Sequence, residues 1–167
     1  MQKTLSLEAW QVFIFLILPL FFPENMIGFT LTLIFVITAG LWAWSLGEAL
    51  YAKLPGGHTM NLNRFKAFLV IPAVYFLLVT FLMNGGYEIT NSNFDSFGAI
   101  AYLLVPMHLF CMYCIFYCIY FLAKSLECVE SRNKNPQTSD YIGNFFCLWF
   151  IPFGIWFVQP KIKRIFN

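Results

Sequence analysis

Charge is what this sequence has least of. Lys, Arg, Asp and Glu make up 11% of its 167 residues, and long stretches contain none of them. A formal net charge of +2, with scattered basic residues, argues against nucleic acid as a partner. The chain also lacks a phosphate-binding glycine motif, a nucleophile elbow and a paired-carboxylate site. We therefore predict no enzyme activity and no cofactor.

What fills the sequence instead is apolar: hydrophobic residues account for 60% of it. A hydrocarbon core about 30 Å thick needs about 20 apolar residues in a helix, because lipid cannot satisfy backbone polar groups. Runs of this kind predict four membrane-spanning helices, at about residues 5–22, 27–51, 65–83 and 98–123. The expected fold class is all-α: an integral membrane protein in which a four-transmembrane-helix bundle forms a single domain over residues 1–167. We expect the lipid bilayer to be one of its partners.

The basic residues predict the orientation, because cytoplasmic loops retain Lys and Arg. Connections at about residues 23–26 and 84–97 contain neither residue type, whereas the opposite connections contain several. This asymmetry places both termini in the cytoplasm.

A final aromatic segment, at about residues 141–158, has basic residues on both flanks and Pro152 to Gly154 in its middle. A re-entrant or interfacial segment keeps all the basic residues on the cytoplasmic side, and we favour it for that reason. The alternative is a fifth, kinked transmembrane helix, since membrane helices tolerate Pro and Gly.

Three stretches carry a resemblance to known proteins. They are LEAWQ at residues 7–11, FCMYCIFYCIY at 110–120 and NFFCLWFIPFGIWFVQPK at 144–161. Together they resemble a group of small, uncharacterised bacterial multi-pass membrane proteins, over most of the chain. The resemblance implies a bacterial cytoplasmic (inner) membrane and implies no activity.

One polar stripe falls within the fourth predicted span: His108, Cys111, Cys114 and Cys118 share a helix face. His and Cys are ligands for Zn²⁺, Cu⁺ or iron, and a His near the bilayer midplane suggests function. A single straight helix cannot surround an ion, however, and no other predicted span offers a His or Cys at that depth. We therefore expect a packing role for the cysteines and commit to no metal.

Two further features lie in the second predicted span. Glu48 is near its cytoplasmic end, and we expect an ion pair with Lys53, Lys66 or Lys124; proton or cation handling is the alternative.

Gly40, Ala43 and Gly47 form a stripe of small residues that lets another helix approach closely. Packing within one protomer is the expected use, and a contact between copies is the alternative.

These patterns predict a non-catalytic function, as an accessory, partner-binding or oligomer-forming subunit of a bacterial membrane system, with a protein partner or self-association. A first alternative is a homo-oligomeric channel, pore or membrane-perturbing effector. A second, a metal- or haem-binding membrane oxidoreductase, rests on the stripe from His108 to Cys118 alone.

Overall fold

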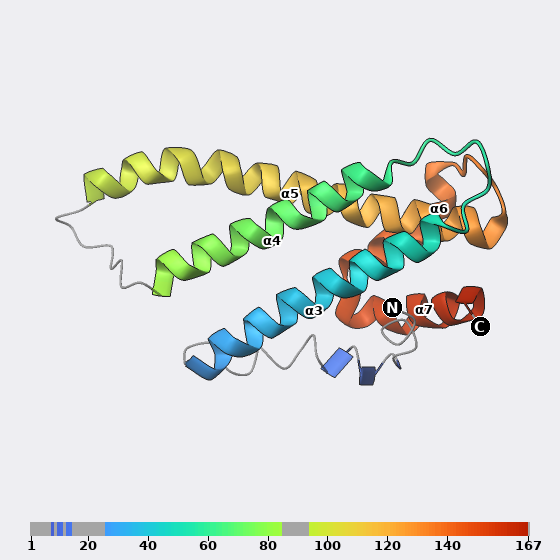
Figure 1. The fold of residues 1–167 in the computed structure, drawn as a ribbon, viewed down its shortest axis with the longest axis horizontal. Coiled ribbons are helices and arrows are strands. Elements are labelled where there is room, and N and C mark those ends of the chain that lie inside the picture. Colours follow the sequence, from blue (N-terminus) through green and yellow to red (C-terminus); the bar gives the residue numbers. More distant parts are fainter. Residues whose placement is uncertain (1–7, 9, 12, 15–25, 85–93, 167) are drawn as a thin grey trace.

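The long apolar runs form long helices. The computed structural model describes residues 8, 10–11, 13–14, 26–84 and 94–166. The numbered elements in this part of the chain are all helices (Figure 1). They are α3 (Met26–Tyr51), α4 (Leu62–Asn84), α5 (Phe94–Ser131), α6 (Thr138–Trp149) and α7 (Ile151–Phe166). The predicted all-α class is confirmed for the described residues.

Three of these helices are long and apolar enough to cross a membrane. The qualifying stretches are Thr30–Tyr51 in α3, Leu62–Thr80 in α4 and Tyr102–Ser131 in α5. They coincide with the second, third and fourth predicted spans, so the chain has the character of a membrane protein. The first predicted span, at 5–22, lies mostly outside the described residues, and the four-helix bundle stays a prediction.

The few described residues near the amino terminus contact α7. Glu8 forms an ion pair with Lys163, and the rings of Phe13 and Trp156 lie 6.2 Å apart. The two contacts place this short stretch along the surface of α7.

The helix α5 is longer than its apolar run. It has 38 residues, or about 57 Å at 1.5 Å per residue, and continues to Ser131 where residue 123 was the predicted end. Lys124, Glu127 and Glu130 are good helix formers, so the helix extends beyond the apolar segment. Equating the helix with its apolar part was the error in the predicted boundary.

The aromatic segment predicted at 141–158 consists of two short helices. The helix α6 ends at Trp149, and α7 begins two residues later. A Cβ atom on Gly154 would lie 1.8 Å from the Cys147 carbonyl oxygen, so the two helices meet too closely for any side chain there. The break therefore falls at Phe150, and Pro152 to Gly154 belong to the first turn of α7, where proline is tolerated.

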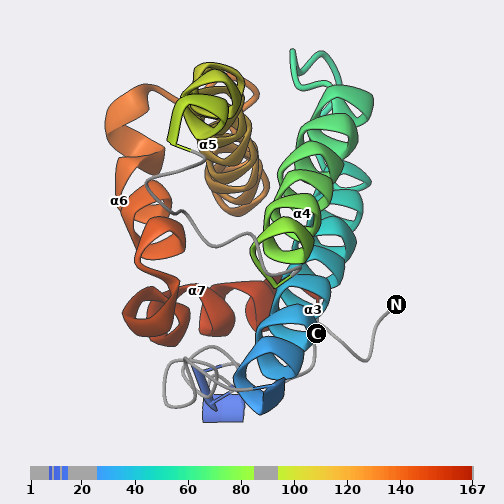
Figure 2. The ribbon, with the colours of Figure 1, turned by 90° about the vertical axis from the view of Figure 1, so that its left-hand side faces the viewer.

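One end of the molecule gathers several helix ends. We call it the charged end: α3 stops there at Tyr51, α4 starts at Leu62 and α5 stops at Ser131 (Figure 1). The start of α6 and the end of α7 also lie there, because the chain turns back at Phe150. Figure 2 shows α6 on one side of α5 and α3 with α4 on the other, while α7 crosses below.

The hydrophobic core occupies only the half of the molecule next to the charged end, which we call the charged half. Among the described residues, it includes α3 from Trp42, α4 up to Leu69, α5 from Cys111, and both short helices. The rings of Phe65 and Phe121 stack at its centre with centroids 4.4 Å apart. The largest fully buried apolar side chains are Phe65, Phe121, Leu46, Leu50, Leu126, Ile155, Ile162 and Val158.

The remaining parts of the three long helices form the open half, at residues 30–41, 70–80 and 102–110. None of the side chains in these three ranges is buried. The helices therefore share a common core near the charged end and lack one away from it.

Candidate functional site

The charged end holds the basic residues. Every Lys and Arg in the described ranges lies at or near it, at the ends of the three long helices, in their connections or on α7. They are Lys53, Arg64, Lys66, Lys124, Arg132, Lys134, Lys161, Lys163 and Arg164. The asymmetry seen in the sequence is thus an asymmetry in space.

Glu48 is paired across the interface between α3 and α4. Its carboxylate forms an ion pair with Lys66, and the Lys66 ammonium also lies 4.8 Å from the centroid of the Trp44 ring. Of the three lysines predicted as partners, the structure selects Lys66. Both side chains are partly exposed, and the pair links α3 to α4.

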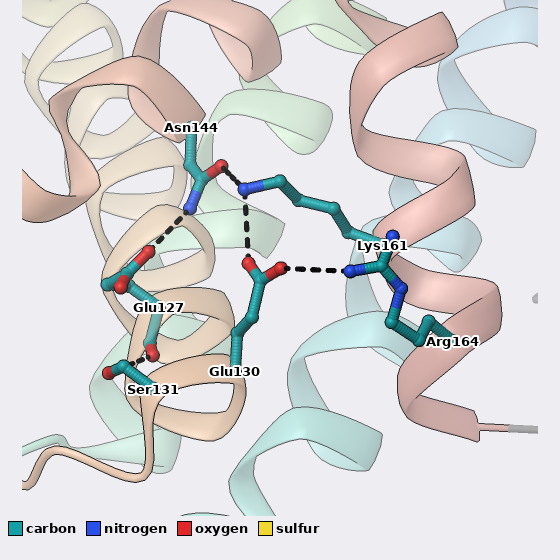
Figure 3. Close-up of polar contacts among 6 residues, drawn as sticks. All are labelled: Glu127, Glu130, Ser131, Asn144, Lys161 and Arg164. Atoms are coloured by element: carbon teal, nitrogen blue, oxygen red, sulfur yellow. Dashed lines mark hydrogen bonds and ion pairs between the residues drawn. The ribbon is translucent and has the colours of Figure 1, made fainter.

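A second polar network joins α5 to both short helices (Figure 3). The Lys161 ammonium lies 3.0 Å from a Glu130 carboxylate oxygen and donates to the Asn144 side-chain oxygen at 3.1 Å. The Asn144 amide in turn donates to the Glu127 carboxylate at 3.3 Å. The other Glu130 oxygen lies 3.9 Å from Arg164. One residue of α6 and two of α7 are therefore held by two carboxylates of α5.

This network was not found from the sequence. Its residues are far apart in the chain, and only Asn144 is buried, at 6% exposure. The sequence did offer one signal for this network, which is matched spacing. Glu127 and Glu130 are three residues apart, as are Lys161 and Arg164, and residues at this spacing share a helix face.

The stripe from His108 to Cys118 is divided in the structure. Cys111, Cys114 and Cys118 are buried free thiols, whereas His108 is exposed. The Cys118 thiol donates to the Phe65 carbonyl oxygen at 3.7 Å, which is a packing contact between α5 and α4. Within the described residues, no three His, Cys, Asp or Glu side chains are placed to hold a metal ion. The metal hypothesis gains no support from this arrangement.

The stripe of small residues is divided as well. A Cβ atom on Gly47 would lie 2.4 Å from Cε1 of Phe65, so α3 and α4 approach closely at this glycine. Ala43 is partly buried against the core, whereas a Cβ atom on Gly40 would meet nothing within 4 Å. Packing within the protomer therefore uses the end of the stripe nearer the charged end.

The open half of α5 is exposed around most of its circumference. Residues 102, 103 and 105–110 are all exposed, and a run of this length samples every direction around a helix. Tyr102 is 86% exposed. The rings of His108 and Tyr75 lie with their centroids 6.0 Å apart. We take this surface, together with the neighbouring part of α4, as the candidate site for interaction within the membrane.

The comparisons with known proteins return no match: no protein-family model, no curated protein and no solved structure is similar to this chain.

Proposed function

We propose that the protein is a small, non-catalytic subunit of a membrane system, which binds the transmembrane helices of a partner or of further copies through its open half. The exposure of residues 102, 103 and 105–110 of α5, with His108 among them, carries this proposal. An imidazole facing hydrocarbon is unfavourable, and a polar group at this depth is normally covered by another helix. Lipid chains are as apolar as the helix side chains, so no hydrophobic force drives helices together in a membrane. The association of helices therefore relies on close packing and on hydrogen bonds.

We propose that the charged end faces the cytoplasm of a bacterium. This orientation agrees with the retention of Lys and Arg on the cytoplasmic side. The resemblance of three sequence stretches to bacterial multi-pass proteins supports the same membrane.

In this orientation α6 and α7 form a re-entrant hairpin that enters from the cytoplasmic side and returns to it. Both of its outer ends belong to the charged end, where Lys161 lies beside Glu130 of α5. The hairpin tip is aromatic and exposed: Phe150, Phe153 and Phe157 are 58%, 73% and 68% exposed. Aromatic side chains of this kind suit the boundary between headgroups and acyl chains.

The first test is gentle solubilisation of native membranes, affinity purification of the full chain and measurement of its native mass. We expect a complex of defined stoichiometry, with either another membrane protein or further copies. A homo-oligomer of fixed order would make conductance in liposomes the next measurement. A monomer carrying only lipid, under every mild detergent that keeps known complexes intact, would contradict the proposal.

A photo-crosslinking residue locates the contact. Leu109 is 65% exposed in the open half, and Ile142 is 38% exposed on α6, so either can be replaced without disturbing the core. Illumination in native membranes is expected to give a discrete protein adduct from position 109 and a weaker one, or none, from position 142. Equal labelling at both positions would show that the open half is not the interaction surface.

A further inference from the structure

A cavity lies at the charged end, outside the polar network and the open half. Its volume is about 500 Å³, and its lining residues are Lys53, Pro55, Cys128, Val129, Arg132 and Ile165. The loop after α3, the end of α5 and the end of α7 therefore meet around one space. Cavities of this size hold small ligands or headgroups.

Among the described residues, the lining contains two cations and no acidic side chain. The two carboxylates next to the lining residues of α5 have other partners: Glu127 accepts a hydrogen bond from the Asn144 amide, and Glu130 interacts with Lys161 and Arg164. The positive charge of the cavity is therefore not neutralised by any acidic group in the described residues that line it.

The two cations are held differently. The Lys53 ammonium donates to the Ile165 carbonyl oxygen at 2.6 Å and lies 4.7 Å from the centroid of the Phe166 ring, which fixes it at the junction with α7. Arg132 follows α5 directly and has a positive φ of 56°, which turns the chain sharply at this point. No ion pair to Arg132 is found among the described residues, so its guanidinium is available to a ligand.

In the insertion proposed above, on which this step rests, the cavity lies on the cytoplasmic side, at the ends of two helices that could cross a membrane. The helices that could cross a membrane end at Tyr51 in α3 and at Ser131 in α5, and the last two turns of α5 already carry Lys124, Glu127 and Glu130. Lys53 is two residues beyond the first of these positions, and Arg132 is one residue beyond the second. Pro55, Val129 and Ile165 provide apolar walls between the cations.

We propose that this cavity binds a phosphate group, supplied either by an anionic lipid headgroup or by a free phosphate. Arg132 offers the planar fork of N–H donors that matches two phosphate oxygens, and Lys53 adds a point charge. Basic cavities between transmembrane helices on the cytoplasmic side are suited to such headgroups.

The test compares two charge-matched double variants of the full chain. Lys53→Gln with Arg132→Gln removes both cavity cations, whereas Lys124→Gln with Arg164→Gln removes two cations of the charged end that do not line the cavity. Each purified protein, in mild detergent, is titrated with phosphatidylglycerol and with phosphatidylcholine of the same acyl chains, and bound lipid is counted by native mass spectrometry. Circular dichroism and elution volume verify that each variant is folded.

We expect the wild type and the Lys124/Arg164 variant to bind one phosphatidylglycerol in preference to phosphatidylcholine. The cavity variant is expected to bind phosphatidylglycerol at least about ten-fold more weakly. Unchanged binding by the cavity variant would overturn the proposal, and so would an equal loss in both double variants, which would indicate general surface charge.

A second arm distinguishes the two sources of phosphate. Inorganic phosphate is titrated alone, with intrinsic tryptophan fluorescence and thermal unfolding as readouts. Saturable binding of phosphate that Arg132→Gln abolishes, with no preference for phosphatidylglycerol, would assign a free phosphate. Preferential binding of phosphatidylglycerol without saturable phosphate binding would assign a lipid headgroup, and saturable binding of neither would overturn the proposal.

The single variant Arg132→Gln provides the decisive result if the double variant does not fold, because Arg132 makes no ion pair within the described structure.

Discussion

The charged half and the open half are built from the same three apolar helices, yet only one of them has a core. Leu46 and Leu50 of α3 are 1% and 0% exposed, whereas Ile37 and Leu41, less than three turns earlier on the same helix, are 55% and 60% exposed. Hydrophobicity does not distinguish the two halves, because an apolar side chain is equally stable against lipid and against another helix. The two halves differ in the contacts that hold the three long helices together.

Two short helices supply that difference. Among the described residues, the hairpin of α6 and α7 packs on the charged half, and the rings of Trp149 and Phe116, with centroids 4.3 Å apart, mark a contact near its tip. Its polar network fastens it to α5 through Glu130 and Lys161. The charged half is therefore held together by specific contacts with the hairpin, and the open half does not share these contacts.

Breaking the hairpin is expected to have the largest effect. In Gly154→Ala, the new Cβ atom would collide with the backbone carbonyl of Cys147, which has no freedom to move aside. We expect a loss of about 3 kcal/mol or more, because overpacking against backbone cannot relax. Thermal unfolding in a fixed detergent measures it. Gly143→Ala is the matched control on α6, since a Cβ atom there meets nothing within 4 Å; equal loss in both variants would refute the argument.

The second test compares the two halves on a single helix. Gly47→Ala places a Cβ atom 2.4 Å from the Phe65 ring, whereas Gly40→Ala meets nothing within 4 Å. We expect Gly47→Ala to destabilise the protein by about 1–3 kcal/mol, because the ring must shift within the core. Gly40→Ala should leave the unfolding temperature of the purified chain unchanged. If Gly40→Ala were the more harmful variant of the isolated protein, the open half would contain an unrecognised core.

A smaller effect is expected from the polar network. Lys161→Met and Glu130→Gln, alone and combined, form a double-mutant cycle on a pair that is about one-third exposed. We expect a coupling of about 1 kcal/mol, decreasing with added salt, because solvent screens partly exposed charges. Thermal unfolding at two salt concentrations provides the measurement, and zero coupling at low salt would show that the network does not hold the hairpin.

The smallest effect on stability is expected at His108. His108→Leu should change the free energy of unfolding of the purified chain by no more than about 0.5 kcal/mol, because exposed positions tolerate substitution. The same variant should recover less of the partner, or of the oligomer, from native membranes. A loss of 1 kcal/mol or more in the isolated protein would instead make His108 a structural residue.

The sequence predicted the bounds of α3 and α4 closely, placed the end of α5 eight residues too early, and indicated few of the contacts between helices. The bounds of α3 and α4 differ by at most three residues from the predicted 27–51 and 65–83, because apolar length determines a span. The polar network was missed because Asn144 and Lys161 gain their partners only after the chain has turned back at Phe150. The sequence was enough to locate the two stripes. It did not show which end of each stripe is buried, because burial depends on how the helices cross, and hydrophobicity does not determine the crossing.

The position of the hairpin has a consequence for the bilayer. Within the described residues, a section through the charged half crosses both short helices as well as α3, α4 and α5, whereas the open half contains only the three long helices. Inserted as proposed, the protein displaces more lipid from the inner leaflet than from the outer one. Because of this wedge shape, the free energy of the inserted protein depends on membrane curvature. A partner bound to the open half would make the cross-section equal in the two leaflets.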